Sequence, residues 1–531
     1  MLIRSTHSTG SPRRGVVLLA VLLVVVVLTL AAYQYSEWIT AERRAADAYS
    51  RAAQARALAQ SGVHFAAAVL SNPDAMTNTL NDNPWDNAAA FQNVKVGDGG
   101  SGPQGVFSII GLLPPDDPSA ASQPYRFGVV DEAGKININA LLGLDSGKGD
   151  AAHAMLMLLP NMTDDIANSI LDWLDPDDTP RSNGAEEEYY GTLTPPYHCK
   201  NGPLDSLEEL LLVKGVTPQL LFGNDRNRNG VLDADEDDGS AQVDLGWSAY
   251  LTVYSREPNT DAKGNARIYI NDTDINSLAD KLTAVLSQDM ANYIIAYRLY
   301  GPAAAPPTPP GAPTPPTTQT PPLSDSDSDD VKTQLTTARA NTSTQKPQSL
   351  KSILDLLGSK VSITTGSGRT MKTITWACPL NDPSVLKTQL PLILDQTTTS
   401  QNPDLTPRIN VNTASETVLA TLPGLDEEEV QMILTSRSDP SSNEAPAPIF
   451  QTPAWLLTEA NLPVAKVKAL EAYITARTQV YRFQALGYFQ GGGPTARFEA
   501  VVDGNNGRPR IVYLRDLAEL GPGFNMNATG P

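Results

Sequence analysis

A long apolar segment stands at the start of the chain. Residues 16–33 are almost all Val, Leu or Ala, and no charged residue occurs from position 16 to position 36. At 1.5 Å per residue this segment gives a helix of roughly 30 Å, the thickness of a hydrocarbon core. Arg4, Arg13 and Arg14 precede it without any acidic residue. We therefore expect the N-terminus to stay in the cytoplasm and the rest of the chain to lie outside it.

Three interpretations compete for this segment. A cleaved signal peptide usually has a shorter apolar region, whereas this one continues into an alanine-rich helical stretch. An ordinary single-pass anchor explains the length alone. Arg13-Arg14-Gly15 directly before an apolar helix resembles the leader of type IV prepilins, and the resemblance implies that a membrane peptidase cuts between Gly15 and Val16.

Beyond the membrane segment the pattern stays helical, and strands come later. Neither Pro nor Gly occurs from residue 16 to 61, and Asn72-Pro73 ends the helix. Small residues recur along its second half at three- and four-residue steps, which favours packing on a sheet of the same domain. Strand-like patterns occur at 106–110, 125–130, 478–485, 496–502 and 510–514.

The middle of the chain contains a repeated helical unit. The sequence KININA at 135–140 is echoed by RINVNTA at 408–414. Thr413 and Glu416 predict a capping box, and the Leu-Pro-Gly-Leu turn that follows makes residues 408–437 similar to a helix-hairpin-helix motif. That motif often binds DNA through basic neighbours, but residues 426–429 of this hairpin are all acidic. A structural role is therefore favoured.

Charge and cysteine content narrow the function further. The chain has 39 basic and 59 acidic residues, and its net charge of −20 repels phosphate backbones, so we expect no nucleic-acid partner. Cys199 and Cys378 are too few for a disulfide framework or a four-cysteine zinc site, although one disulfide between them stays open. The four histidines are scattered and no catalytic motif accompanies them. We predict no catalytic residues and no enzyme activity.

Residues 225–236 carry the clearest chemical signal. Their sequence, DRNRNGVLDADE, fits the calcium-loop pattern D-x-[DN]-x-[DN]-G-x5-E at every position. The alternative is a solvated acidic turn. The predicted calcium ligands are the side chains of Asp225, Asn227, Asn229, Asp233 and Glu236 and the backbone carbonyl of Val231. A second oxygen-rich group, which caps and surface turns explain about as well, consists of Asp172, Asp175, Asp177 and Glu186.

Several segments resemble the minor pseudopilin K of type II secretion systems. They read DWLDPDDTPR at 172–181, GAEEEYY at 184–190, PLDSLEEL at 203–210, VKGV at 213–216 and NVNTA at 410–414. With the leader, they lie on both sides of a Pro/Thr-rich segment. The resemblance implies an α+β fold, in which a long N-terminal transmembrane helix and a pilin-like α/β domain carry a large inserted α-helical domain that binds calcium. It also implies a place beside two other minor pseudopilins at the tip of a periplasmic pseudopilus.

These patterns divide the chain into seven segments. The composition of residues 302–322, and of the acidic run 325–330 that follows, excludes a packed core and predicts an extended linker or an exposed loop. The segments are a leader at 1–15, a transmembrane and long helix at 16–72, the first part of the pilin-like domain at 73–135, the inserted helical domain with the calcium loop at 136–300, a Pro/Thr/Ser-rich linker or insert at 301–346, a further helical part at 347–477, and strands that complete the sheet at 478–531.

Two functions from different classes fit these features. The first is a structural subunit that helps to export folded proteins, single-pass in the inner membrane with most of the chain in the periplasm. Its partners would be other minor pseudopilins, the major pseudopilin and the prepilin peptidase. The second is a membrane-tethered, calcium-dependent binding or hydrolytic protein with an ordinary anchor. Most prepilin relatives have glutamate at the fifth position after the leader, where this chain has Ala20, and this favours a tip subunit without a neighbour above it.

The leader resemblance predicts a mature chain that begins at Val16. Replacing Gly15 by leucine should block processing, because a bulky side chain closes the peptidase pocket. Mass spectrometry of the N-terminal peptide from membranes measures this, with Ser11→Leu as a control away from the cut. Recovery of intact Met1 chains beside an active prepilin peptidase would contradict the prediction.

Overall fold

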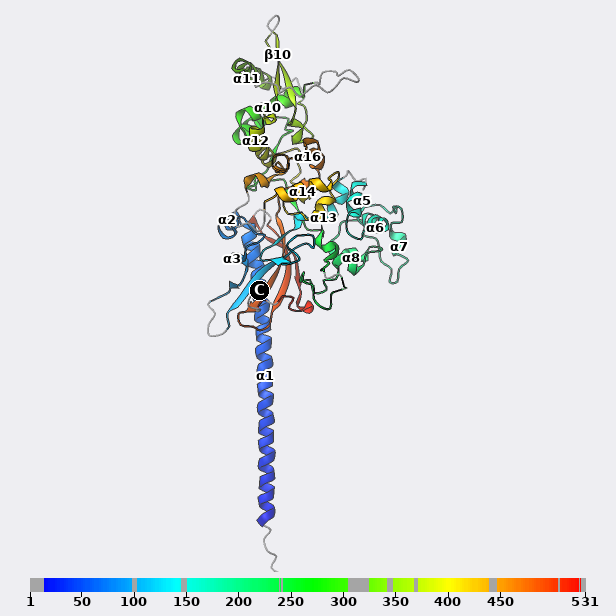
Figure 1. The fold of residues 1–531 in the computed structure, drawn as a ribbon, viewed down its shortest axis with the longest axis vertical. Helices are drawn as coiled ribbons and strands as arrows, with labels where there is room; N and C mark the ends of the chain where they lie inside the picture. The colour runs from blue at the N-terminus through cyan, green and yellow to red at the C-terminus, as the bar shows by residue number, and fades with distance from the viewer. Residues whose placement is uncertain are drawn as a thin grey trace, which may run out of the picture.

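A single long helix, α1 (Arg14–Ser71), projects from the body that holds all other elements in this computed structural model (Figure 1). The structure describes residues 14–97, 103–144, 150–237, 239, 242–303, 324–340, 347–366, 371–438, 447–504, 507–524 and 526. Outside these residues lie residues 1–13 of the predicted leader, residues 304–323 and 341–346 of the predicted linker, and the turn at 505–506.

Helix α1 has an exposed half and a packed half. An 18-residue window in it has a mean hydropathy of 3.1 and no buried residue, so by length and composition this half can cross a membrane. The other half packs on the sheet through small residues, among them Ala55 and Ala59. The approach is close, since a Cβ added to Gly487 of the sheet would lie 2.1 Å from the carbonyl oxygen of Ala55. The predicted packing of small residues on a sheet is confirmed.

The sheet is antiparallel and combines both ends of the chain. Because β4 pairs with β15, with Asp131 opposite Tyr481, the chain leaves the sheet and returns to it at neighbouring strands. The predicted fold class, a pilin-like α/β domain with an inserted helical domain, is confirmed. The strand order is β1 (Val94–Lys95), β2 (Gly105–Leu112), β15 (Val480–Phe489), β16 (Ala496–Asp503) and β17 (Arg510–Asp516), with β3 (Tyr125–Arg126) beside β2 and β4 (Val130–Asp131) beside β15.

The two faces of the sheet differ in character. Alternate residues of β15 and β16 point toward α1 and form an apolar core with it. The residues between them include Gln484, Arg497 and Glu499, which are only 3%, 1% and 8% exposed. A strand with one apolar and one polar side usually faces water on the polar side. Here the helical insert covers that side.

The insert contains two related helical units, each closed by a parallel pair of two-residue strands. In the first unit β5 (Ile136–Asn137) pairs with β6 (Leu251–Thr252), and in the second β13 (Ile409–Asn410) pairs with β14 (Ile474–Thr475). Both copies of the sequence repeat make the same turn. Asn137 and Asn410 each accept a 3.0 Å hydrogen bond from the backbone amide two residues further on.

Each unit holds two helix pairs of the same construction. A residue with φ between 54° and 84° separates the two helices of each pair, as Asn161, Gly215, Gly424 and Asn461 do in turn. Asn and Gly accept this left-handed conformation at the lowest cost. The pairs are α5 (Asp150–Met157) with α6 (Asp164–Leu174), a 3-10 helix (Leu207–Leu212) with α8 (Pro218–Phe222), α13 (Glu416–Ala420) with α14 (Glu427–Ser436), and α15 (Trp455–Thr458) with α16 (Val464–Leu470).

The capping box predicted at Thr413 is wrong. Ser415 caps α13 instead, and Thr413 Oγ1 donates a 2.6 Å hydrogen bond to Asp131 of the sheet. A tertiary contact thus takes the hydroxyl that local sequence assigned to the helix. A capping box does occur in this helix pair, between Asp426 and Glu429 at the start of α14.

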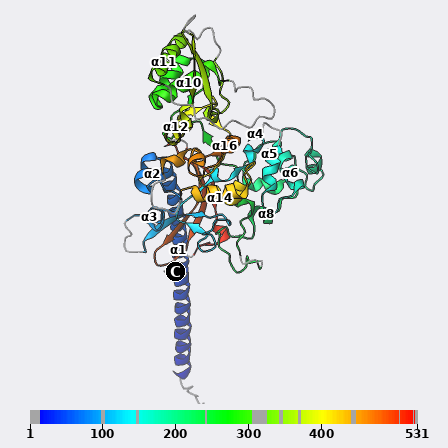
Figure 2. The ribbon, with the colours of Figure 1, turned by 45° about the horizontal axis from the view of Figure 1, so that its top comes forward.

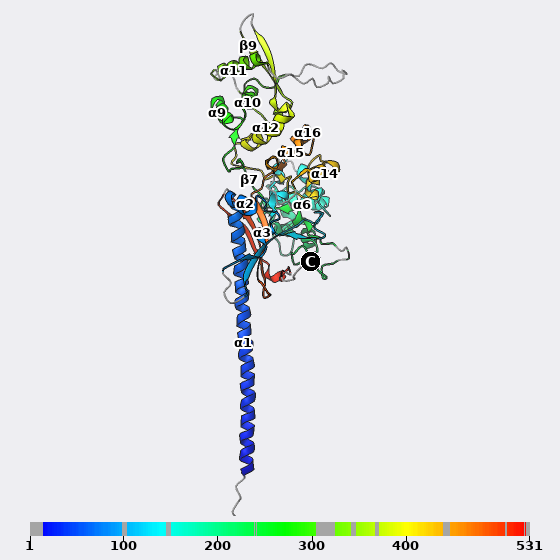
Figure 3. The same cartoon turned by 60° about the vertical axis from the view of Figure 1, so that its left-hand side comes forward.

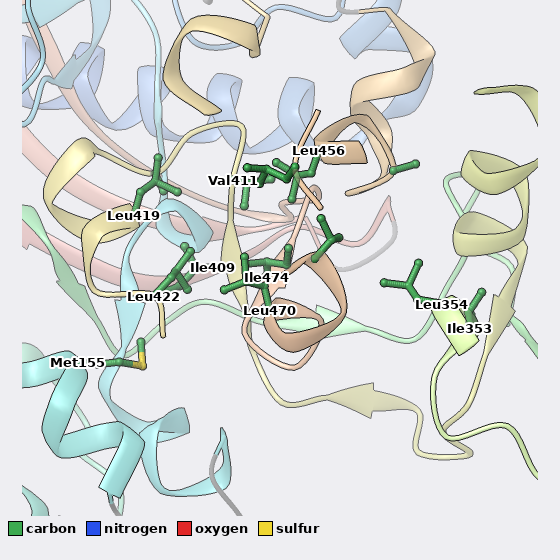
Figure 4. Close-up of a cluster of buried hydrophobic side chains, with 14 of the residues drawn as sticks. Met155, Ile353, Leu354, Ile409, Val411, Leu419, Leu422, Leu456, Leu470 and Ile474 are labelled. Carbon is green, nitrogen blue, oxygen red and sulfur yellow. The ribbon is translucent and has the colours of Figure 1, made fainter. Parts of the chain in front are cut away.

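One apolar core runs through the whole insert. Figure 4 shows Ile409 and Ile474 of the paired strands close to Leu470. Met155 of the first unit and Leu354, from the part of the insert farthest from α1, belong to the same cluster. Each fully buried side chain of this size contributes about 1.5–3 kcal/mol. The two helical units and the distal lobe therefore share one apolar core and are not packed separately.

The outermost part of the insert forms a distal lobe, on the side opposite the free half of α1 (Figures 2 and 3). The prediction of an extended linker is wrong for residues 325–340, which form α11 and bury Val331 and Leu335. Two apolar residues one turn apart dock an otherwise polar helix. The lobe contains α9 (Ile275–Val285), α10 (Gln288–Tyr300), α11 (Asp325–Ala340), α12 (Pro383–Gln396) and the hairpin of β9 (Lys360–Thr365) and β10 (Lys372–Ala377).

Short elements complete the structure. In the insert, α4 follows β5, and the strand pairs β7–β12 and β8–β11 join the segment that enters the distal lobe to the segment that leaves it. These elements are α2 (Pro73–Leu80), α3 (Ala88–Phe91), α4 (Leu141–Leu144), α7 (Glu187–Tyr190), β7 (Glu257–Pro258), β8 (Ile268–Tyr269), β11 (Thr397–Thr398) and β12 (Asp404–Leu405).

Candidate functional site

The predicted calcium loop, residues 225–236, lies just after α8 and folds back on itself. Its first and last predicted ligands, Asp225 and Glu236, are 4% and 5% exposed. Backbone amides of the loop hold both carboxylates in place, so the frame of the loop is formed. Asp225 accepts hydrogen bonds from the amides of Asn229 (3.1 Å) and Gly230 (2.8 Å), and Glu236 accepts them from the amides of Arg226 (2.8 Å) and Asn227 (3.2 Å).

Three further predicted ligands meet inside the loop. The side-chain amides of Asn227 and Asn229 donate hydrogen bonds to Asp233 Oδ2 at 2.6 and 3.1 Å. These neutral donors satisfy the carboxylate oxygen on the side where a cation would bind. The oxygens of these amides face the backbone, where Asn227 accepts from the amide of Asn229 at 3.0 Å and Asn229 accepts from the amide of Val231 at 2.6 Å. A half-turn of either side-chain amide, which breaks its backbone bond, would aim its oxygen at the ion position. All the side chains are oxygen donors, the type that calcium prefers, so these residues fit the ion.

Two left-handed residues give the loop its sharp turn. Gly230 has φ +70°, at the position where the calcium-loop pattern requires glycine. Arg228 has φ +59°, which costs a residue with a side chain about 1–2 kcal/mol. Its guanidinium lies 4.3 Å from the centre of the Phe222 ring and 3.5 Å from carboxylate oxygens of both Glu208 and Glu499. These contacts offset the backbone strain.

Three of the four residues of the second predicted group come together near the C-terminal end of α6. Asp175, Asp177 and Glu186 each place one carboxylate oxygen within 4.8 Å of the others, and the described parts of the chain contain no other such acidic trio. Both oxygens of Glu186 and Oδ1 of Asp175 are buried without a hydrogen-bond partner at normal distance. Orphaned carboxylate oxygens are costly, so this trio has the character of a cation site.

Asp172, the fourth predicted residue, does not join the trio. Its carboxylate accepts 2.8 Å hydrogen bonds from Arg181 Nη1 and from the amide of Ala185. Arg181 also forms an ion pair with Asp175. Asp172 therefore holds the loop that carries Glu186 by accepting these hydrogen bonds. Because its carboxylate is already paired with donors, it is not a candidate metal ligand.

The trio is electrostatically unbalanced. Burial raises the pKa of Glu186 to about 7, and the nearby charges of Asp172 and Asp175 add to this shift. The Cys199 thiol, a weak donor, acts in the opposite direction. Burial also raises the pKa of Asp175 and, in the calcium loop, that of Asp225. Both predicted sites thus hold a carboxylate whose pKa is raised by burial.

Both cysteines are free thiols. Cys199 is partly buried near Glu186, and Cys378 is buried just after β10. The structure therefore does not contain the disulfide that the sequence left open between these two residues. Burial raises the pKa of each thiol to about 12, which makes both poor nucleophiles at neutral pH.

Two residues that contact the calcium loop were not found from the sequence. Arg497 of β16 donates to the carbonyl of Asn227 at 2.6 Å, and Gln484 of β15 donates to the carbonyl of Arg228 at 2.7 Å. They stand 270 and 256 positions away from these partners. Their position on the polar side of two strands was the only local signal, and that signal normally marks a surface exposed to water.

A membrane-anchored, pilin-like protein is the class that these features define: an apolar N-terminal helix packed on an antiparallel sheet, with a helical insert carrying two oxygen-rich groups. Residues 134–222 match the sequence profile of the family described as type II secretion system (T2SS), protein K. This segment is the start of the insert and contains the Asp175, Asp177 and Glu186 trio. Over these residues the chain is similar to the type II secretion protein K family.

Individual relatives agree with this family over short segments. A putative type II secretion system protein K of Escherichia coli (strain K12) is 45% identical over 58 residues, 11% of this chain and 18% of the relative. Type II secretion system protein K of Pectobacterium carotovorum subsp. carotovorum is 32% identical over 75 residues, 13% and 23% of the two chains. The chain thus matches about a fifth of the length of these curated relatives.

A solved structure can also be superposed on most of the chain. It is the crystal structure of the GspK-GspI-GspJ complex from the enterotoxigenic Escherichia coli Type 2 Secretion System. The superposition covers 90% of this chain and 98% of that chain, at 10% identity and a TM-score of 0.34. A similarity of this degree is too weak to establish a shared fold.

The unbalanced trio predicts an unusual pH dependence when a chelator is present. The pKa of Glu186 is higher in the folded chain than the ordinary glutamate value of 4.5, so the folded state binds the extra proton and its stability falls as pH rises from about 4.5 to about 7. Glu186→Gln should remove on the order of 2–3 kcal/mol of this fall. Chemical denaturation of the full chain in detergent between pH 5 and pH 7.5 measures it.

Glu188→Gln serves as the matched control, because Glu188 is exposed and lies two positions away. The other acidic and basic groups around the trio are Asp172, Asp178 and Arg181, and these are the same in both variants. If the free energy of unfolding varies with pH in the same way in the wild type and in Glu186→Gln, the prediction is contradicted, because the pKa of Glu186 is then not raised by folding.

Proposed function

We propose that the protein is a minor pseudopilin at the tip of a type II secretion pseudopilus and takes part in the export of folded proteins across the outer membrane. The observation that carries this proposal is the place of the insert. The matched residues 134–222 belong to it, and its distal lobe extends beyond the sheet on the side opposite the free half of α1 (Figure 1). A subunit stacked on that side would meet the lobe, so the chain fits a filament end better than a shaft.

The apolar residue Ala20 supports the same place in the filament. A carboxylate in hydrocarbon is costly unless it is paired, for example with the N-terminal amine of a neighbouring subunit. A terminal subunit has no neighbour above it to supply that amine. Alanine at this position avoids an unpaired charge.

The proposal includes an anchored mature chain. The apolar half of α1 would lie in the inner membrane, with the body in the periplasm, after the prepilin peptidase has cut before Val16. Support comes from Arg13 and Arg14, which favour a cytoplasmic N-terminus, and from the free, lipid-compatible surface of α1. Its partners would be other minor pseudopilins and the major pseudopilin, which share such a helix.

We also propose that calcium binds to the loop at 225–236 and to the trio of Asp175, Asp177 and Glu186. The ion would supply positive charge to buried carboxylates and so stabilise the insert. For the loop, support comes from the complete sequence pattern and the formed backbone frame. For the trio, it comes from three buried carboxylate oxygens without donors.

Glu236→Gln tests the loop. Glu236 would close the site with two oxygens, so its loss should weaken calcium binding by at least tenfold and reduce the thermal stabilisation that calcium gives. Titration calorimetry of the full chain in detergent measures the affinity. Asp235→Asn removes the same charge from an exposed neighbour outside the ligand positions and should bind nearly as well. No heat of calcium binding at millimolar concentration would leave only the acidic-turn interpretation.

Copy number tests the tip assignment. A terminal subunit is present about once per filament, whereas a shaft subunit repeats. Quantitative mass spectrometry of sheared pseudopili should find this chain far below the major pseudopilin, and Ala20→Glu should not raise its share. Similar amounts of the two proteins would refute the assignment.

A further inference from the structure

The calcium loop does not stand free in solvent but is docked on the buried polar side of the sheet. Arg497 Nη2 donates to the carbonyl of Asn227 at 2.6 Å. Gln484 Nε2 and Arg497 Nη1 both donate to the carbonyl of Arg228, at 2.7 and 3.2 Å. Beside Arg497, the Asn229 side-chain amide donates to the carbonyl of Gly523 at 2.8 Å. Three sequence-distant segments of the pilin-like domain therefore hold the loop.

Arg497 is an unusual residue to find there. It is 1% exposed, and among the described residues no carboxylate forms an ion pair with it. Its remaining contacts are Gln484 Oε1 at 3.2 Å and the ring of Phe524 at 5.6 Å, and its Nε has no hydrogen-bond partner. A buried guanidinium beside a cation site repels the incoming ion. We therefore explain the position of Arg497 by the hydrogen bonds that it donates to the loop, and not by its charge.

The contacts fix the part of the loop that must turn most sharply. The carbonyls of Asn227 and Arg228 point outward to the sheet, which orients the peptide planes on both sides of the left-handed Arg228. With these carbonyls held outside, the side chains of Asn227 and Asn229 turn inward toward Asp233. The sheet thus preorganises the ligand positions of a loop that belongs to the insert.

We infer that Arg497 and Gln484 are positioning residues for calcium at this loop, and that calcium binding is coupled to docking of the insert on the sheet. The inference rests on the calcium site proposed above. Coupling is reciprocal, so the free energy by which the docked sheet improves calcium affinity is also the free energy by which calcium strengthens docking. Bound calcium would in this way stabilise the contact between the insert and the sheet.

Calcium titration of Arg497→Met, as the full chain in detergent, tests the inference. Coulomb's law alone predicts tighter binding once a nearby positive charge is removed. Positioning predicts the opposite, and we expect binding at least tenfold weaker than in the wild type. Arg510→Met removes the same charge from the exposed end of β17 and should leave the affinity unchanged. Arg497→Lys keeps the charge but loses the fork and should also bind more weakly.

Hydrogen exchange of the wild type keeps the inference testable if these variants fold poorly. Calcium should slow exchange in β15 and β16 as well as in the loop, and Glu236→Gln should abolish both effects. Equal or tighter binding by a folded Arg497→Met, or protection confined to residues 224–236, would overturn the coupling while leaving the calcium site intact. Absence of calcium binding by the wild type would overturn the site itself and the coupling with it.

Discussion

The sheet and the insert are joined by a buried cluster of ion pairs. In this cluster Arg482 of the sheet pairs with two carboxylates. Arg482 lies 2.8 Å from Glu132, in the first turn of the insert, and 2.9 Å from Glu499 on the next strand. Burial alone would raise the pKa of Glu132, but the charges of Arg482 and Lys135, together with hydrogen bonds from Arg482 and Thr252, lower that pKa to about 2. Such a cluster gains little over an apolar one, but loss of one member costs about 3–5 kcal/mol. It therefore specifies one arrangement.

That arrangement determines which residues meet. Because the insert starts beside β4 and ends at β15, its first unit is laid over the polar side of the sheet, where Gln484 and Arg497 reach the calcium loop. Asp131, at the end of β4, receives hydrogen bonds from Asn410 and Thr413 of the second unit. Both helical units are thus held by polar groups of the sheet, while apolar packing within the insert supplies most of its stability.

Local features were predictable from the sequence, and distant contacts were not. Three features were predictable because each depends on a short stretch of chain: the apolar helix, the last three strands and the calcium-loop pattern. The periodicity or the residue spacing within such a stretch is enough to predict them. Thr413 was assigned to a cap because sequence does not show that Asp131 lies beside it. The helix α11 was missed because only Val331 and Leu335 anchor it, and the trio of Asp175, Asp177 and Glu186 was recognised without the knowledge that Asp172 pairs with Arg181 instead.

The proposed place of the chain at the end of a filament depends on these contacts. With the insert locked over one side of the sheet and the distal lobe beyond it, the chain is bulky at the end away from the membrane helix. The central claim is that this bulk ends a filament. Electron microscopy of pseudopili labelled with an antibody against the distal lobe tests it most directly. The account predicts label at one end only, and label repeated along the shaft would contradict it.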